Sequence, residues 1–176
     1  MKMIVAVDRQ WGIGYKGDLL ARVRADLMNF KKHTAGKTVV YGSNTLATFP
    51  GGKPLKNREN IILHPSVDFK VEGAIVAHSL DELFEILRAR ENTENVYVIG
   101  GASVYTQLLP YCDTAIVTKF DKSYDKDVYI PDLDASDAWE CREVGEKQVS
   151  DAETDTEGGL EFYFTIYERT KEHRTI

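Results

Sequence analysis

Hydrophobic residues along the chain gather into short runs that polar, glycine-bearing segments separate. Such mostly apolar runs, rich in β-branched residues, predict strands that are covered on both faces, as in a parallel sheet. A weaker run of the same kind lies at 74–77. The clear runs are 3–7, 38–42, 60–63, 95–101 and 114–120.

Other segments between these runs show helical spacing. In 79–90, Leu80, Leu83, Phe84 and Leu87 form one apolar face, and Ser79 with Glu82 has the spacing of a capping box. Two shorter helices are predicted at 43–49, capped by Ser43 or Asn44, and at 102–109.

A fourth helix, from about residue 21 to His33, carries an acid on its apolar side. Val23, Leu27 and Phe30 form a stripe that we expect to pack on the core, and Asp26 lies at its edge. A carboxylate there must be solvated, paired or used for chemistry, because burying an unpaired charge is costly. Arg22, four residues earlier, offers a surface ion pair worth about 0.3 kcal/mol, so both a pair and a functional role stay open.

The C-terminal part of the chain has a different pattern. Residues 139–144 and 160–169 alternate apolar and polar side chains, which predicts antiparallel strands with one wet face. The acidic, glycine-ended segment 150–159 between them is expected to be a mobile, solvated hairpin tip. Segments 8–18 and 121–134 are predicted as connecting loops. Together the elements predict one α/β domain over 1–176 with a mostly parallel sheet and a mixed edge.

The composition excludes several classes of function. The 176 residues are 43% hydrophobic and 28% charged, as in ordinary globular domains, and the net charge of -6 argues against binding to a nucleic-acid backbone. Cys112 and Cys141 lack the spacing of metal ligands and are expected to be reduced thiols, and the histidines suggest no metal site. No apolar run is long enough for a membrane span or a signal peptide, so we expect a cytoplasmic protein.

Two strand–glycine–helix junctions are the first chemical signal. VIGGASVY (98–105) and YGSNT (41–45) each place a helix start directly after a buried strand. Backbone N–H groups at such a start can bind an anion such as a pyrophosphate, and both junctions would lie at the carboxyl edge of the sheet. The alternative is a tight turn without a ligand, since the G-x-G-x-x-G fingerprint is absent. GIG (12–14) adds a third point where a cofactor could approach the backbone.

Taken in order, several segments resemble the dihydrofolate reductase family along nearly the whole chain. They are IVAVD, GIGYKGDLL, Asp26 followed by Phe30, VVYGSNT, PLKNRENIIL, VIGGASVY and IVTKF. The resemblance implies reduction of 7,8-dihydrofolate to 5,6,7,8-tetrahydrofolate with NADPH, by hydride transfer to C6 and protonation at N5. It implies a mixed, mostly parallel eight-stranded sheet with about four helices and a C-terminal antiparallel hairpin. We expect a monomer that binds dihydrofolate and antifolate-like small molecules, and neither nucleic acid nor membrane.

The resemblance also implies roles for particular residues. Asp26 would bind the pterin edge, Thr118 would hold Asp26, and Tyr105 would complete the catalytic group. Arg58 would take the glutamate α-carboxylate, and residues 9–24 would form a loop that closes over the nicotinamide. The other substrate contacts would be Val5, Ala6, Leu27, Phe30, Phe49, Leu55 and Ile99. The cofactor contacts would be Ala6, Ile13, Gly14, Gly42, Ser43, Asn44, Thr45, Leu63, His64, Gly100, Gly101, Ala102, Ser103, Val104 and Tyr105.

Two departures from the family's pattern carry their own expectations. Ala21 stands where the family usually has an aromatic residue, so we expect a wetter pocket mouth. Ser43 and Ser103 stand where many relatives have arginines that grip the 2′-phosphate, which leaves hydroxyls, helix ends and His64 or His78. The hypothesis is a weaker preference for NADPH that strengthens at lower pH as a histidine charges.

Two rival interpretations remain. A pyrimidine reductase of riboflavin synthesis would share the fold and the glycine pair, but not the acid on the first helix or the arginine of LKNR. A nucleotide-binding homologue without turnover would fit Ala21, but not the joint presence of Asp26, Thr118 and the glycine pair.

Overall fold

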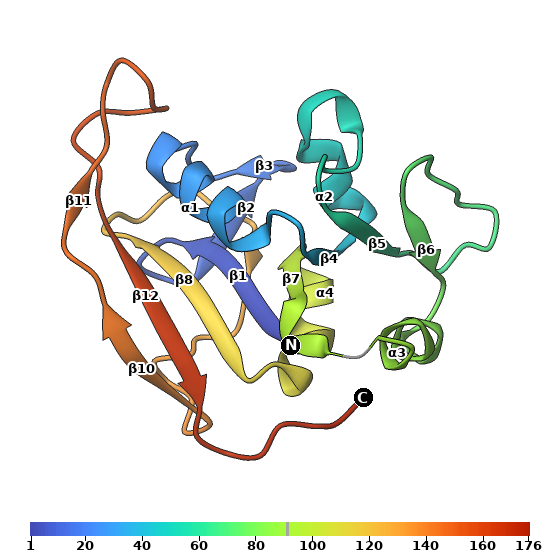
Figure 1. Ribbon diagram of the computed structural model, residues 1–176. Helices are drawn as coiled ribbons and strands as arrows, with labels where there is room; N and C mark the ends of the chain where they lie inside the picture. Colours follow the sequence, from blue (N-terminus) through green and yellow to red (C-terminus); the bar gives the residue numbers. More distant parts are fainter. Residues whose placement is uncertain (91) are drawn as a thin grey trace.

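A mixed β-sheet forms the centre of the molecule, and the computed structural model describes residues 1–90 and 92–176. In those residues the main sheet has nine strands in the order β10-β12-β8-β1-β7-β4-β5-β6, with β11 paired to β12 off this path (Figure 1). The strands are β1 (Lys2–Val7), β4 (Thr38–Gly42), β5 (Glu59–Leu63), β6 (Ile75–Ala77), β7 (Val96–Gly100), β8 (Thr114–Phe120), β10 (Trp139–Val144), β11 (Gln148–Val149) and β12 (Glu161–Arg169).

The strand directions confirm the predicted sheet. All neighbours from β8 to β6 pair in parallel, whereas β12 is antiparallel to β8, β10 and β11. Because β1, β7, β4 and β5 are parallel, their carboxyl ends meet at one edge of the sheet, where ligands of α/β proteins bind.

Helices cover both faces of this sheet. On one face Leu46 and Ile99 form a core against which Phe30 packs, and on the other face Leu87 and Leu108 belong to the larger core. The helices are α1 (Arg24–Thr34), α2 (Ser43–Thr48), α3 (Leu80–Arg88) and α4 (Ala102–Leu108), and 3-10 turns lie at Pro50–Gly52, Thr93–Asn95 and Leu109–Tyr111.

The predicted helix starts are partly right. The Ser79 side chain accepts from the backbone N–H of Glu82 at 3.1 Å, as predicted, while the Glu82 carboxylate accepts from the N–H of His78 at 2.8 Å. The prediction that Ser43 or Asn44 caps α2 is wrong. Gly42 occupies the cap position in extended conformation without a side-chain bond, because β4 runs straight into the helix.

Segments 8–18 and 121–134, predicted as loops, form a second small sheet. Its strands β2 (Gly12–Tyr15), β3 (Asp18–Leu19) and β9 (Val128–Tyr129) pair in the order β3-β2-β9. They are too short to show a hydrophobic period, so the sequence pattern could not predict them.

The Asp8 carboxylate ties this small sheet to the end of β1. It accepts from the N–H of Gly12 at 2.9 Å, from the N–H of Tyr124 at 3.0 Å and from Lys126 Nζ at 2.6 Å. The side chains of Asp8 and Lys126 are 0% and 5% exposed. The two loops are therefore joined by a buried ion pair.

The acidic loop 150–159 has mostly exposed side chains, as predicted, but it is not a free tip. The Thr156 hydroxyl accepts from the N–H of Arg22 at 2.6 Å, and the Asp155 carboxylate accepts from the N–H of Arg24 at 2.7 Å. In Figure 1 the loop between β11 and β12 accordingly lies beside the start of α1.

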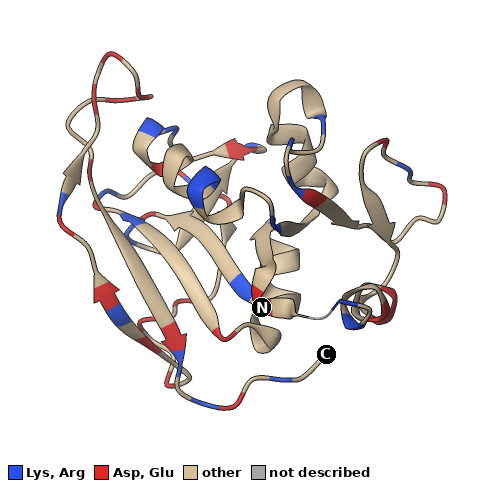
Figure 2. Ribbon diagram, viewed as in Figure 1, with Lys and Arg blue, Asp and Glu red and all other residues tan. Residues whose placement is uncertain are grey.

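Charged residues of both signs are interspersed over the molecule, and the central strands of the main sheet are largely free of them (Figure 2). Within the described residues, no helix has the length and apolar character needed to cross a membrane.

Candidate active site

A cavity of about 1300 Å³ opens at the carboxyl edge of β1, β7, β4 and β5. The residues predicted for substrate and cofactor contact, scattered from Val5 to Tyr105, line this one space. They are Val5, Ala6, Ile13, Gly14, Asp26, Leu27, Phe30, Gly42, Ser43, Asn44, Thr45, Phe49, Leu55, Arg58, Leu63, His64, Ile99, Gly100, Gly101, Ala102, Ser103, Val104 and Tyr105. Thr118, the remaining predicted residue, is buried behind the wall.

Asp26 lies in the first turn of α1 and faces the cavity. Desolvation by the surrounding protein raises the pKa of its carboxyl to about 6, and a hydrogen bond from the Thr118 side chain works in the opposite direction. Arg22 does not pair with it, since its guanidinium binds Asp18 at 2.8 Å. The ion-pair interpretation of Asp26 is therefore wrong.

The apolar stripe of α1 divides between core and cavity. Val23 is buried with Phe162 and Leu160, but Leu27 is 45% exposed and lines the cavity. The prediction that the whole stripe packs on the core is wrong for Leu27, because an open cavity and not a core faces that turn of the helix.

The Gly100–Gly101 turn brings backbone close to side chains that line the cavity. Gly100 has φ +126°, and a Cβ there would lie 3.0 Å from Thr45 Oγ1 and 3.4 Å from the Tyr105 ring. A Cβ on Gly42 would lie 3.3 Å from a Val104 methyl. The starts of α2 and α4 thus lie side by side. Gly42 and Gly100 leave a hollow there, the glycine cradle, which larger residues would fill.

Tyr105 is fixed beside this turn. Its hydroxyl donates to the carbonyl of Ile4 at 2.7 Å, and burial, with a smaller contribution from the Asp26 charge, raises the pKa of its phenol far above the ordinary value. Tyr105 therefore presents its ring to the cavity and keeps its proton.

Arg58 lies at the other end of the cavity. Its Nε and Nη2 donate to Thr34 Oγ1 at 3.2 and 3.0 Å, its Nη1 donates to the carbonyl of Lys56 at 2.8 Å, and its guanidinium lies 6.0 Å from the centre of the Phe30 ring. The cation is held in place where it can meet an anionic group.

Two histidines, His64 and His78, line the part of the cavity beyond the ends of β5 and β6, which we call the arm. His78 Nδ1 lies 3.0 Å from the carbonyl oxygen of His64, and His64 Nδ1 accepts from the N–H of Ser66 at 3.2 Å. Because a carbonyl can only accept, His78 carries its proton on Nδ1 when neutral, whereas His64 carries it on Nε2.

Several lining residues were not predicted. The clearest is Phe120, which the alternation of β8 could have found because it shares a face with Thr118. The others outside the predicted loop 9–24 are Ile4, Lys31, Ala47, Thr48, Pro50, Pro65, Ser79, Leu80, Gln107 and Val128.

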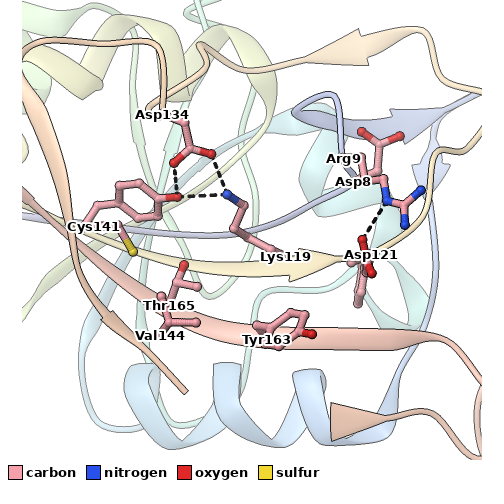
Figure 3. A pocket seen from close by; sticks show the side chains of 11 residues that line it. Asp8, Arg9, Lys119, Asp121, Asp134, Cys141, Val144, Tyr163 and Thr165 are labelled. Atoms are coloured by element: carbon pink, nitrogen blue, oxygen red, sulfur yellow. Dashed lines mark hydrogen bonds and ion pairs between the residues drawn. The ribbon is translucent and has the colours of Figure 1, made fainter. Parts of the chain in front are cut away.

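A smaller cavity of about 500 Å³ lies over β8, β10 and β12 (Figure 3). At one end Asp134 accepts from Lys119 at 2.5 Å and from the Tyr167 hydroxyl at 2.6 Å, and at the other end Arg9 binds Asp121 at 2.7 Å. These charges satisfy one another, so nothing in this cavity is directed at a ligand.

Known proteins are similar to this chain along nearly its whole length. The family model described as dihydrofolate reductase matches residues 1–169. Curated proteins named dihydrofolate reductase are similar over nearly the whole chain. The one from Bacillus subtilis is 32% identical over 169 residues, which is 96% of this chain and 94% of that protein. The one from Staphylococcus haemolyticus is 30% identical over 171 residues, 97% of this chain and 96% of that protein.

A solved structure is also similar. It is described as dihydrofolate reductase from Enterococcus faecalis complexed with NADP(H) and RAB-propyl. It superimposes with a TM-score of 0.80 at 32% identity and covers 97% of this chain and 96% of its own.

Proposed function

The chain belongs to the dihydrofolate reductase family, and we propose that the larger cavity is where it carries out that family's reaction. The activity is the NADPH-dependent reduction of 7,8-dihydrofolate to 5,6,7,8-tetrahydrofolate. When bound, NADPH supplies the hydride that is added to C6, and N5 takes up a proton. The observation that carries the assignment to this cavity is the Asp26 carboxyl, with its raised pKa, in the same space as the Gly100–Gly101 turn.

Asp26 binds and polarises the pterin in this proposal. Its two oxygens match the coplanar donors N3–H and the 2-amino group of the pterin. Because burial raises its pKa to about 6, the Asp26 carboxylate stabilises positive charge on the bound pterin more strongly than a solvated aspartate would, which favours protonation at N5 from water. Thr118 keeps the carboxyl oriented.

The glycine cradle fits the cofactor. The absence of side chains at Gly100 and Gly42 lets a pyrophosphate approach the backbone at the starts of α4 and α2. Ile13 and Gly14 lie on β2, within the loop 9–24 that we propose closes over the nicotinamide. The Tyr105 ring forms the wall between the nicotinamide and the pterin.

The arm beyond β5 and β6 holds the adenosine end of the cofactor. His64 and His78 are the residues of this arm of the described cavity that can become cations. We expect the preference for NADPH over NADH to strengthen as pH falls, because a charged imidazole binds the 2′-phosphate better than a neutral one. Steady-state kinetics with both cofactors, from about pH 5.5 to about pH 8, measure this. An NADPH/NADH ratio that stays constant with pH would contradict it.

Arg58 binds the α-carboxylate of the glutamate tail, and Lys31 on the same rim adds a second cation. We propose that the protein acts as a monomer. The free thiols of Cys112 and Cys141 suit the cytoplasm.

The decisive experiment compares the natural chain with Asp26→Asn. Loss of NADPH absorbance on addition of dihydrofolate should be rapid for the natural chain and at least about a hundredfold slower for the variant, because the amide cannot carry the negative charge that stabilises the bound, protonated pterin. Equal rates for the two proteins would overturn the role of Asp26, and a natural chain without turnover would overturn the activity.

A further inference from the structure

Phe120 at the end of β8 lines the cavity on the same wall as the group that holds Asp26. Successive side chains of a strand point to opposite faces, so Thr118 and Phe120 point to the same one. Thr118 hydrogen-bonds the Asp26 carboxyl. Phe120 therefore lies two residues along the same strand face from the group that acts on Asp26.

The ring is held by the sheet itself. Phe120 is directly opposite Phe162 on β12, and the two rings meet edge to face with centroids 6.2 Å apart. Phe162 makes a similar contact with Phe164 at 5.6 Å, and Phe164 is the cross-strand partner of Thr118. Edge-to-face contacts of this kind fix ring positions in addition to burying apolar area.

Ala21 belongs to the same cluster, and it is 7% exposed. Its methyl group supplies little apolar bulk to that cluster. In this chain the aromatic bulk comes from β8, since Phe120 is 3% exposed and fills the cluster that Ala21 borders.

We propose that Phe120 is a positioning residue for Asp26, whose ring keeps water from the carboxyl in place of an aromatic side chain at Ala21. Because the ring belongs to the main sheet and not to the loop before α1, it stays in place whether that loop is open or closed. This inference rests on the proposed role of Asp26 in the reaction.

Other ionisable groups surround Asp26 and would confuse a test that altered them. Tyr105 is the neighbour from α4, and the rest line the cavity, contact the start of α1 or border the aromatic cluster. They are Asp18, Arg22, Arg24, Lys31, Tyr124, Asp155 and Glu157. Substitutions of phenylalanine leave every one of these groups in place.

The test follows the ionisation of Asp26 directly and needs no turnover. The protein is labelled with 13C at aspartate carboxyls, Asp26→Asn assigns the resonance, and the pKa is read by NMR titration of the ligand-free protein. We expect a pKa of about 6 for the natural chain. Phe120→Ala should lower it by about one unit, which reduces the protonated fraction at neutral pH about tenfold.

Phe84→Ala is the matched control, because Phe84 on α3 is also a buried phenylalanine, but it belongs to the other core and does not line the cavity. It should lower the melting temperature as Phe120→Ala does, yet leave the pKa of Asp26 within about 0.3 unit of its natural value. If both variants shift the pKa equally, or if neither shifts it, the proposal is wrong. Should the alanine variants not fold, Phe120→Leu and Phe84→Leu give the same comparison with smaller shifts.

A rescue sharpens the result. Adding Ala21→Phe to Phe120→Ala returns an aromatic ring to the space from the α1 side and should restore the pKa of Asp26. Because the titration is independent of catalysis, a natural chain that fails to reduce dihydrofolate would overturn the proposed function while leaving this measurement intact.

Discussion

Asp8 and Asp26 are two aspartates enclosed by protein, and their surroundings shift the pKa values of their carboxyls in opposite directions. Burial would raise the pKa of Asp8, but the Lys126 ammonium and the backbone N–H groups of Tyr124, Gly12 and Gln10 outweigh it and hold the pKa below 3.8. At Asp26, burial meets the single opposing contribution of Thr118, and the pKa rises to about 6.

The difference lies in the supply of donors and not in the acids themselves. The carboxylate of Asp8 has four donors from two segments of chain, so its charge is stabilised and its role is to hold the small sheet to β1. Asp26 has an open cavity where such donors would be. In the proposed function the pterin edge supplies these donors to Asp26.

The largest effect on stability should come from breaking the buried ion pair of Asp8 with Lys126. Lys126→Met keeps the length of the side chain but leaves a buried carboxylate without its cation, which should lower the free energy of unfolding by about 3–5 kcal/mol. Urea denaturation followed by circular dichroism measures it. In the double variant with Asp8→Asn most of the loss should return, and a loss below about 1 kcal/mol in Lys126→Met would show that the pair is not structural.

A smaller effect of opposite sign is expected at Asp26. The raised pKa means that the folded state holds the neutral acid, so stability is lost as pH rises through about 6. Asp26→Asn should therefore raise the free energy of unfolding by about 1–3 kcal/mol near pH 8 and leave it unchanged near pH 3. Parallel denaturation curves at the two pH values check this.

Asp8→Asn provides the contrast to that variant. A pKa held below 3.8 contributes stability that is present above the ordinary aspartate pKa and is lost as pH falls. This variant should be less stable than the natural chain at neutral pH, and the gap should narrow in acid. A gap that stays constant with pH would contradict the comparison of the two acids.

Thr118→Val removes the one side-chain donor of Asp26 at nearly constant volume. The pKa of Asp26 should rise further above 6, because the hydrogen bond that favours its charged form is gone. A lost bond to a charged group corresponds to about 1.5 kcal/mol, or roughly tenfold in kcat/KM. The pH profile of kcat/KM would show the inflection at higher pH, and an unmoved inflection would argue against the bond.

Arg22→Ala should have the smallest effect. The Arg22–Asp18 pair is exposed on both sides and contributes at most about 1 kcal/mol. Because Arg22 pairs with Asp18 and not with Asp26, the inflection of the pH profile should stay where it is. A shift of the inflection to higher pH would mean that the guanidinium stabilises the Asp26 charge after all.

Much of this architecture follows from local pattern. The apolar runs 38–42 and 114–120 predict β4 and β8 to the residue, because strands buried on both faces need continuous apolar side chains. The alternating segment 139–144 predicts β10 to the residue, because one face of that strand is wet. The spacing of Ser79 and Glu82 also predicts the cap of α3. The sequence does not predict the small sheet, because β3 and β9 have two residues each and pair only when distant loops meet in space.

By itself the sequence determined where strands end in glycine, and therefore where a ligand edge lies, because periodicity and turn chemistry act within a few residues. It also identified Asp26 as an acid out of place. Only the tertiary structure decided what surrounds each acid. The partner of Asp8 lies 118 residues away at Lys126, and the group that lowers the pKa of Asp26 is Thr118 on the distant strand β8. A carboxylate's pKa depends on groups within a few ångströms in space, and no local pattern records which distant segments the fold brings there.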